Sequence, residues 1–294
     1  MTTGMTLKTI TSPERMYQWV SRAVLEGRKV GVVPTMGALH EGHLSLVDAA
    51  KAECDLVVAT IFVNPTQFAA GEDLDQYPRP LENDLRHLKE GGASIAFCPA
   101  MEEIYPRGYS TYVSPPEIAA PFEGLHRPDH FRGVATIVLK LFQMVPAQVA
   151  FFGQKDYQQT LVVKKMVEDF NLPIEIRVCP ILREPDGLAM SSRNVFLSDE
   201  QRGRAVAISK VLAEIEPEIL RLTDHSSALK NRLTGVMETA RKRLEVKVDK
   251  IHYLDVVDAQ TLQSISDTTT EVVIVAAADV GDTRLLDNRL VKIR

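Results

Sequence analysis

A glycine-containing turn with two histidines, His40 and His43, carries the clearest chemistry in the sequence. It follows an apolar run, residues 29–33, and opens an amphipathic run, residues 39–53. The first turn of a helix offers N–H groups and positive potential, which suit a phosphate. Gly42 lets a flat base or a ribose approach the backbone. We therefore expect a nucleotide here, with both imidazoles on one helical face and donating to phosphate oxygens as charge develops at phosphorus.

Two other interpretations of the histidine pair stay open. The rings can be ordinary surface histidines, or they can hold a metal ion. Helix-borne zinc pairs usually have a different spacing and a glutamate base, so we favour the nucleotide.

A second polar segment follows the β-branched run at residues 56–63 and carries Asn64 and Gln67. Neutral amides orient hydroxyl or carboxylate groups without titrating, so we expect both side chains to bind a substrate. The alternative is an Asx-type turn around Pro65.

A third segment follows the apolar run at residues 148–152. Lys155 is a compact cation that suits phosphate oxygens. Asp156 can cap the next helix or bind a ribose hydroxyl, and Gln159, one turn beyond Lys155, can face the same pocket. A capped surface helix is the alternative for these residues.

A fourth segment contains Ser191, Ser192 and Arg193. Two hydroxyls and a guanidinium in a small-residue loop suit a mobile phosphate clamp, although a Ser-rich linker with Arg193 paired to a carboxylate fits as well. Asp84 is a candidate for indirect magnesium binding, because Mg²⁺ usually takes one or two carboxylates together with phosphates and waters. A solvated surface acid is the alternative.

These segments need a scaffold that brings strand ends together, and the first two-thirds of the chain has the pattern of one. Short apolar runs predict buried strands at residues 29–33, 56–63, 94–98, 148–152 and 174–178. Amphipathic runs predict helices at residues 39–53, 81–90, 130–144 and 158–170. The alternation predicts an α/β fold, a Rossmann-like parallel sheet with helices on both faces and ligands beyond the carboxyl ends of its strands.

The pattern changes after about residue 182, which predicts a smaller C-terminal domain. Helices are expected at residues 199–222 and 226–244, and strands at residues 246–257, 271–278 and 290–293. Strands without intervening helices predict antiparallel pairing in an α+β domain. We place an ATP- and substrate-binding domain at residues 1–182 and a lid domain at residues 183–294, with a turn-like boundary near residues 180–187.

Composition excludes several classes of protein. The 294 residues carry a net charge of -5, so there is no basic excess for an extended nucleic-acid surface. No apolar run approaches the roughly 20 residues of a membrane span, and the N-terminus has no pattern of a signal peptide. The cysteines, Cys54, Cys98 and Cys179, show no metal spacing. We expect a cytoplasmic protein with reduced thiols.

Taken together, the motifs resemble the pantothenate synthetase family, the pantoate–β-alanine ligases. The matching stretches occur in the family's order and are PTMGALHEGH, FVNPTQF, residues 123–134, FGQKDYQQ and MSSRN. The resemblance covers nearly the whole chain and is weakest over about residues 200–250. The HxGH pattern alone indicates only the wider nucleotidyltransferase superfamily, so the combination is far more specific.

The resemblance implies a catalytic role for four residues. His43 would be the proton donor, with His40 its partner at the phosphates. The MSSRN loop lacks the lysines of the Lys-Met-Ser-Lys-Ser loop of class I synthetases, so Lys155 and Arg193 would supply positive charge. The implied ATP contacts are Met36, Gly37, His40, Gly42, His43, Gly153, Gln154, Lys155, Asp156, the backbone of Leu182, Met190, Ser191, Ser192 and Arg193.

The resemblance also implies contacts with the other reactants. Gln67 and Gln159 would bind pantoate, with Gln67 also near β-alanine. Asp84 matches an acidic position linked to Mg²⁺, and Asn83 stands where some relatives carry a second carboxylate. The family further implies a homodimer.

The expected reaction joins pantoate to β-alanine through a pantoyl adenylate, with release of pyrophosphate and then AMP. Two other classes stay open: a nucleotidyltransferase that leaves the nucleotide on its product, and a non-catalytic nucleotide-binding module. The coincidence of four polar loops at strand ends favours an enzyme, and AMP release that depends on β-alanine separates the ligase from the transferase.

Overall fold

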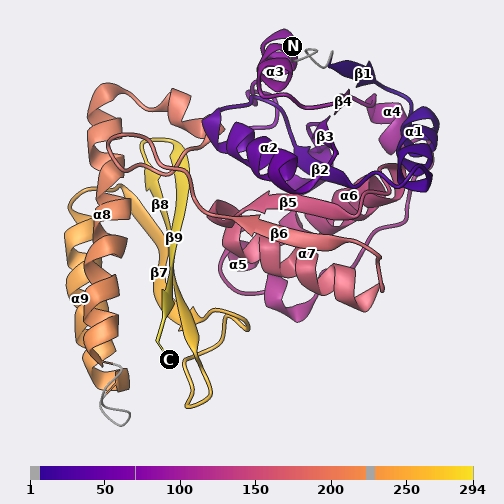
Figure 1. Ribbon diagram of the computed structural model, residues 1–294. Helices are drawn as coiled ribbons and strands as arrows, with labels where there is room; N and C mark the ends of the chain where they lie inside the picture. The colour runs from indigo at the N-terminus through magenta and orange to yellow at the C-terminus, as the bar shows by residue number, and fades with distance from the viewer. Residues whose placement is uncertain (1–6, 70, 223–228, 294) are drawn as a thin grey trace. The chain divides into compact units, whose positions relative to one another are not determined.

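The computed structural model describes residues 7–69, 71–222 and 229–293 (Figure 1). The chain divides into two compact units. The first unit is made of Met1–Gln154 and Gln158–Pro180, and the second of Lys155–Tyr157 and Ile181–Arg294. The segment Lys155–Tyr157 therefore belongs with the second unit although the first unit flanks it in sequence.

The first unit is built on a six-stranded sheet in which every pair of neighbours is parallel. Its strands are β1 (Lys8–Ile10), β2 (Val30–Thr35), β3 (Leu56–Ile61), β4 (Ile95–Phe97), β5 (Val149–Gly153) and β6 (Glu175–Cys179), in the order β1-β4-β3-β2-β5-β6. From β2 the chain runs outward through β3 to β4, which lies beside the edge strand β1, and then returns to β5 on the other side of β2. This reversal puts a topological switch point beside β2, where open α/β sheets bind their ligands.

The helices of this unit join the strands. The longer ones are α1 (Pro13–Leu25), α2 (Glu41–Glu53), α3 (Leu81–Glu90), α6 (His130–Met144) and α7 (Tyr157–Asp169). The shorter ones are α4 (Met101–Ile104), α5 (Glu123–His126) and the 3-10 turns η1 (Pro65–Gln67) and η2 (Glu117–Ala119). The 3-10 turn η3 (Gln154–Asp156) begins in the first unit, and its last two residues belong to the second. Helix α1 begins where Ser12 caps the amide of Arg15 at 3.3 Å and proline occupies the first helical position.

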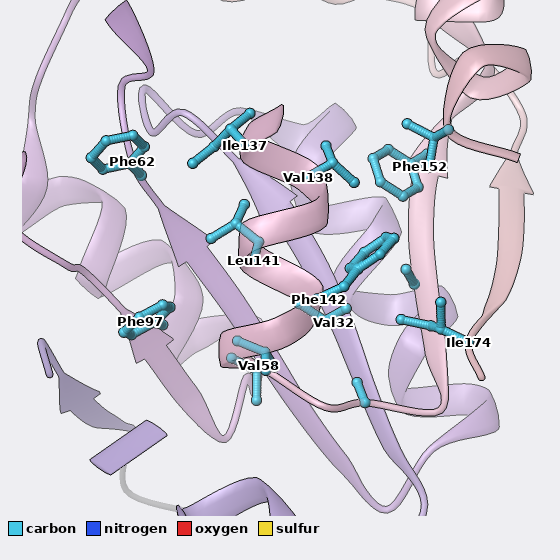
Figure 2. Close-up of a cluster of buried hydrophobic side chains, with 14 of the residues drawn as sticks. Val32, Val58, Phe62, Phe97, Ile137, Val138, Leu141, Phe142, Phe152 and Ile174 are labelled. Atoms are coloured by element: carbon cyan, nitrogen blue, oxygen red, sulfur yellow. The ribbon is translucent and has the colours of Figure 1, made fainter. Parts of the chain in front are cut away.

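Apolar cores lie on both faces of the sheet. On one face Val32, Val58 and Phe152 pack with residues of α1, α6 and α7, and Figure 2 shows side chains of α6 among them. On the other face the alternate strand residues, such as Val33 and Phe151, pack with α2 and α3. The predicted Rossmann-like sheet with helices on both faces is confirmed, and its strands are apolar on both sides because both sides are covered.

The second unit is an α+β structure, as the sequence predicted. Its elements are η4 (Ser192–Phe196), α8 (Asp199–Leu222), α9 (Leu229–Glu245), β7 (Lys250–Asp258), β8 (Glu271–Val280) and β9 (Thr283–Lys292). The three strands pair antiparallel with β8 in the centre, and both helices contribute to one core with them. None of the helices in the described part of the chain has the length and apolarity that a membrane crossing requires.

Several predicted boundaries differ from the observed ones. The sequence patterns gave no element before residue 29, where β1 and α1 lie. Strand β7 begins at Lys250 instead of residue 246, because α9 continues to Glu245. Strand β9 begins at Thr283 instead of residue 290, since buried Asp287 and Asn288 interrupt its apolar pattern. The predicted start of α9, residue 226, lies outside the described residues.

Candidate active site

The turn between β2 and α2 is held by a buried carboxylate from α3. Gly37 and Ala38 have positive φ angles, 84° and 50°, so the chain turns sharply after Met36. Asp84 accepts the amide of Ala38 at 2.9 Å and that of Leu39 at 2.8 Å. The side chain is 1% exposed, and burial raises its pKa, although the two amide bonds act in the opposite direction. Asp84 therefore fixes the conformation of the turn.

The two histidines form the N-terminal cap of α2. His40 precedes the helix, and its Nδ1 accepts the amide of Gly42 at 3.1 Å, while Nδ1 of His43 accepts the amide of His40 at 3.4 Å. The ring centroids are 4.1 Å apart. Because Nδ1 accepts in each ring, the neutral rings carry their proton on Nε2. Neither of these capping bonds uses an Nε2–H group.

This arrangement corrects two details of the sequence-based picture. His40 is the cap residue and not part of the helical face, so the rings meet through the capping box. The first-turn amides are predicted to suit phosphate, yet one of them, the amide of Gly42, donates to His40. In this turn the imidazoles, more than the helix amides, present hydrogen-bond donors.

Gln67 lies at the end of η1, directly after β3 and Asn64. Its Nε2 donates to Met36 Sδ at 2.8 Å, which joins it to the histidine turn. Asn64 is 1% exposed, and its Nδ2 donates to Gln67 Oε1 at 3.1 Å and to the Gly133 carbonyl at 3.2 Å. Asn64 Oδ1 accepts from the hydroxyls of Thr66 and Tyr105 at 2.9 and 2.8 Å. Asn64, predicted as a substrate contact, is therefore enclosed and positions Gln67, which is half-buried.

The strands explain why these residues meet. β3, β2 and β5 are neighbours in the sheet and run parallel, so their carboxyl ends lie at one edge. Met36 follows β2, Asn64 and Gln67 follow β3, and Gly153 ends β5. An added Cβ at Gly153 would have no atom within 4 Å, so its backbone stands clear of neighbouring side chains.

The residues after Gly153 form η3 and the start of α7. Lys155 Nζ lies 3.4 Å from Asp156 Oδ1, and both side chains are partly exposed. Gln159 is half-buried on α7. Its neighbour Gln158 is buried and structural, because it accepts the Glu123 amide at 3.1 Å and donates to the Pro121 carbonyl at 2.7 Å.

In the second unit a hairpin-like segment leads into the predicted phosphate clamp. The Met190 amide donates to the Leu182 carbonyl at 3.1 Å, and the Glu184 amide donates to the Leu188 carbonyl at 2.8 Å. Two residues with implied ATP contacts, Leu182 and Met190, are thus paired directly. Asn194 then donates to Glu184 Oε1 at 2.6 Å and to the Ala189 carbonyl at 3.1 Å, which holds the following loop.

Comparison with known proteins settles the family. The family model described as Pantoate-beta-alanine ligase matches residues 8–290. The chain belongs to this family. A pantothenate synthetase of Rhodopirellula baltica is 51% identical over 286 residues, 96% of this chain and 98% of the relative. That of Acetivibrio thermocellus is 47% identical over 267 residues, 91% and 93% of the two chains. The resemblance stated from the motifs is confirmed.

Solved structures of the family share the fold. Pantothenate synthetase from Thermus thermophilus superposes with a TM-score of 0.86 at 38% identity, covering 97% of this chain and 99% of that one. Pantoate-beta-alanine ligase from Francisella tularensis, solved in complex with beta-gamma ATP and beta-alanine, gives a TM-score of 0.76 at 33% identity, covering 97% and 98%. Both likenesses extend over nearly all of each chain.

A hydrogen-bond network around Arg127 holds the backbone of Gln67. In the sequence, its residues are recognisable only as part of a family motif. Arg127 pairs with both oxygens of Glu72 at 2.7 Å and donates to the Gln67 carbonyl at 3.2 Å. Nδ1 of His130 donates to the same carbonyl at 2.9 Å. Burial and the adjacent Arg127 lower the pKa of His130 to about 4, so its ring is neutral near pH 7. For Glu72, burial raises the pKa and the Arg127 pair lowers it, with a net decrease.

Close packing fixes the same segment from α6. A Cβ added at Gly133 would lie 2.2 Å from the carbonyl oxygen of Thr66 and 2.6 Å from Cα of Gln67. Only glycine allows α6 to approach η1 this closely. The backbone that carries Gln67 is therefore held by packing as well as by hydrogen bonds.

The thiols of the three cysteines and possible metal-binding clusters among the described residues were the other candidates for chemistry. Burial raises the pKa of Cys98 to about 11 and also raises the pKa of Cys54 and Cys179, so thiolate is scarce at neutral pH. Within the described part of the chain, no group of three or more His, Cys, Asp or Glu side chains could hold a metal ion.

Proposed function

We propose that this protein is an AMP-forming pantoate–β-alanine ligase, which uses ATP to condense (R)-pantoate with β-alanine to pantothenate. The observation that supports this most directly is the bond from Gln67 to Met36. It puts an amide suited to a small hydroxy acid beside the turn whose imidazoles suit phosphate. Family membership over residues 8–290 supports the same reaction.

In the first step a pantoate carboxylate oxygen attacks the α-phosphorus of ATP in line. The bond from the α-phosphorus to the bridging oxygen breaks, and pyrophosphate leaves. Nε2–H groups of His40 and His43 stabilise the negative charge that develops on the phosphate oxygens, with His43 as the proton donor. Lys155 and Arg193 would add fixed positive charge. Catalysis then rests on positioning and charge stabilisation.

In the second step the β-alanine amine attacks the acyl carbon of pantoyl adenylate. A C–N bond forms, the acyl–phosphate bond breaks, and AMP leaves with its electron pair. The nitrogen loses a proton to complete the amide. Neither step needs a covalent enzyme intermediate.

We assign contacts residue by residue on the matching motifs. Gln67 and Gln159 would bind pantoate, and Gln67 would also lie near β-alanine. The proposed ATP contacts are Met36, Gly37, His40, Gly42, His43, Gly153, Gln154, Lys155, Asp156, Leu182, Met190, Ser191, Ser192 and Arg193.

Magnesium would enter with the phosphates of ATP. Asp84 does not fit a direct metal ligand, because it is buried and each of its oxygens accepts a backbone amide. Mg²⁺ keeps several waters and commonly relies on substrate phosphates, so Mg²⁺–ATP needs no all-protein cage. The family resemblance also implies a homodimer, which sedimentation of the purified protein tests. The sequence itself predicts a cytoplasmic location.

One assay tests the reaction: ATP with candidate acids and amines, with AMP and product measured together. We expect stoichiometric AMP and pantothenate only with pantoate and β-alanine. Transfer of the nucleotide onto a stable product would identify a nucleotidyltransferase instead. ATP binding without turnover would identify a binding module.

The assigned roles predict the effect of two substitutions. His43→Ala and Lys155→Ala should each lower adenylate formation by roughly 10²-fold or more, since each removes a group that stabilises charge in the transition state. Pantoate-dependent pyrophosphate exchange measures this step. Lys164→Ala, at an exposed position of α7, is the matched lysine control and should change the rate less than about twofold. Near-normal exchange in both active-site variants contradicts the roles.

A further inference from the structure

Two segments that are far apart in the sequence, both with proposed ATP contacts, are hydrogen-bonded to neighbouring residues of strand β9. Asn288 on β9 is 3% exposed, and its Nδ2 donates to the carbonyl oxygen of Lys155 at 2.9 Å. Asp287 beside it is 5% exposed and accepts both terminal nitrogens of Arg183 at 2.7 and 2.9 Å. Burying a polar side chain costs free energy unless it is hydrogen-bonded. Both side chains meet this condition through partners that are distant in sequence, Arg183 and Lys155.

The first attachment explains why Lys155 belongs to the second unit. Lys155–Tyr157 cluster with Ile181–Arg294 although they continue directly from β5. Besides the Asn288 bond, the Tyr157 hydroxyl donates to the Ala259 carbonyl at 2.7 Å. The Lys155 main chain is therefore held by hydrogen bonds within the second unit.

The second attachment fixes the base of the hairpin that leads to Met190. Arg183 forms a bridge with Ala189, and its guanidinium also donates to the Gly187 carbonyl at 3.2 Å. A bidentate guanidinium–carboxylate pair is directional, so it sets the orientation of the hairpin as well as its position. The backbone amide of Asn288 also donates to Asp287 Oδ1 at 2.7 Å, so the two attachments are linked to each other.

We propose that Asp287 and Asn288 are positioning residues for ATP, which hold the Lys155 segment and the hairpin before Met190–Arg193 at a fixed separation on β9. They do not touch the nucleotide. They act through the backbone of Lys155 and through Arg183. This proposal rests on the proposed function, because it assumes that Lys155 and the Met190–Arg193 loop contact ATP.

The test is a double-mutant cycle on the full-length protein, with Asn288→Ala, Lys155→Ala and both together. The readouts are the ATP Kd by calorimetry, the KM for ATP and for pantoate in pyrophosphate exchange, and the thermal midpoint. Asn288→Ala should weaken ATP binding roughly 5- to 10-fold, as expected for one lost buried hydrogen bond. The KM for pantoate should stay within about twofold, and in the Lys155→Ala background the added effect on ATP should be less than about twofold.

Arg289→Gln is the matched control. Arg289 is the next residue of β9, and it pairs with Glu216 instead of Lys155. Its ion pair is partly exposed, so its loss should lower the thermal midpoint less than Asn288→Ala does, with an unchanged ATP Kd. Asp287→Asn should weaken ATP binding also in the Lys155→Ala background, because it acts through Arg183.

The outcomes separate the proposal from the proposed function. An Asn288→Ala protein with unchanged ATP Kd and KM, or an equally large effect with Lys155 absent, overturns the positioning role. A wild-type protein that binds ATP but makes no pantothenate contradicts the proposed function, and the ATP Kd of the variants still decides the role of Asn288.

Discussion

The two compact units hold their chemistry-bearing segments by different kinds of contact. In the first unit the histidine turn rests on Asp84, which is 1% exposed, and Gln67 rests on backbone packed against Gly133. In the second unit the loop before Arg193 is held by side chains, chiefly Asn194 and Glu184, and Glu184 is shared with Arg202. The side chain of Arg202 is 33% exposed, so water reaches this network.

This difference determines how much each contact contributes to the free energy of unfolding. Backbone packed against backbone cannot move aside for an added atom. When a buried carboxylate is replaced, the backbone amides that it accepted are left without hydrogen-bond partners. Partly exposed ion pairs contribute about 0–1 kcal/mol each, and salt screens them. The Asp84 and Gly133 contacts of the first unit should therefore respond steeply to single substitutions, and the Glu184 network of the second unit more gradually.

The steepest response should come from Gly133→Ala. The new Cβ would meet the backbone of Thr66, which cannot move without displacing Gln67, so we expect a loss of about 3 kcal/mol or more in the free energy of unfolding. Urea unfolding and the KM for pantoate measure it. Gly203→Ala is the control, because no atom lies within 4 Å of its added Cβ on helix α8. That variant should gain about 0.5–1 kcal/mol, and equal losses in the two would contradict the role of close packing.

The next largest effect is a pH dependence from His130. Its pKa is about 4 in the folded protein and 6.5 ordinarily, so between these values the unfolded chain binds a proton that the folded protein does not. Stability from this group is therefore lost as the pH falls from about 6.5 to 4, by about 3 kcal/mol across the window. Urea unfolding of the wild type and of His130→Gln over this range measures the difference. Parallel curves for the two proteins would show that His130 is not the group that titrates.

Asp84→Asn should act on the rate more than on stability. Asparagine offers one acceptor oxygen and one NH₂ group to two amide donors, so the bond to Ala38 or to Leu39 is lost. We expect roughly a tenfold decrease in kcat for adenylate formation, as one lost hydrogen bond to a charged acceptor implies. Pyrophosphate exchange at saturating ATP measures it. An unchanged kcat would show that the turn does not depend on this carboxylate.

Asn194→Ala should have the smallest effect of the series. It removes donors to Glu184 and to the Ala189 carbonyl, yet the ion pairs of Glu184 remain. We expect the KM for ATP to rise about 3- to 5-fold in low salt, and the thermal midpoint to fall further at about 0.5 M salt than that of the wild type. A loss as steep as that of Gly133→Ala would remove the contrast between the two units.

The sequence showed the scaffold better than the contacts that hold the site. Alternating apolar and amphipathic runs predict the parallel sheet, because strands covered on both faces must be apolar throughout. The acidic stretch around Asp84 gives no sign that this carboxylate accepts amides 45 and 46 residues earlier in the chain. The sequence pattern at Asp287 and Asn288 is typical of solvent-facing residues, whereas partners distant in sequence, Arg183 and Lys155, contribute to their burial.

The Asp84 contact also has a consequence for synthesis of the chain. The histidine turn lacks its buried acceptor until residue 84 has emerged and α3 has packed, 46 residues after Ala38. At translation rates of about 5–20 residues per second, several seconds separate the two events. A nascent chain in that interval carries both histidines but not the turn that orients them. With the proposed ATP contacts, the site would be complete only once the β2-to-α3 region has folded, and the nucleotide would stabilise finished molecules in preference to partly folded ones.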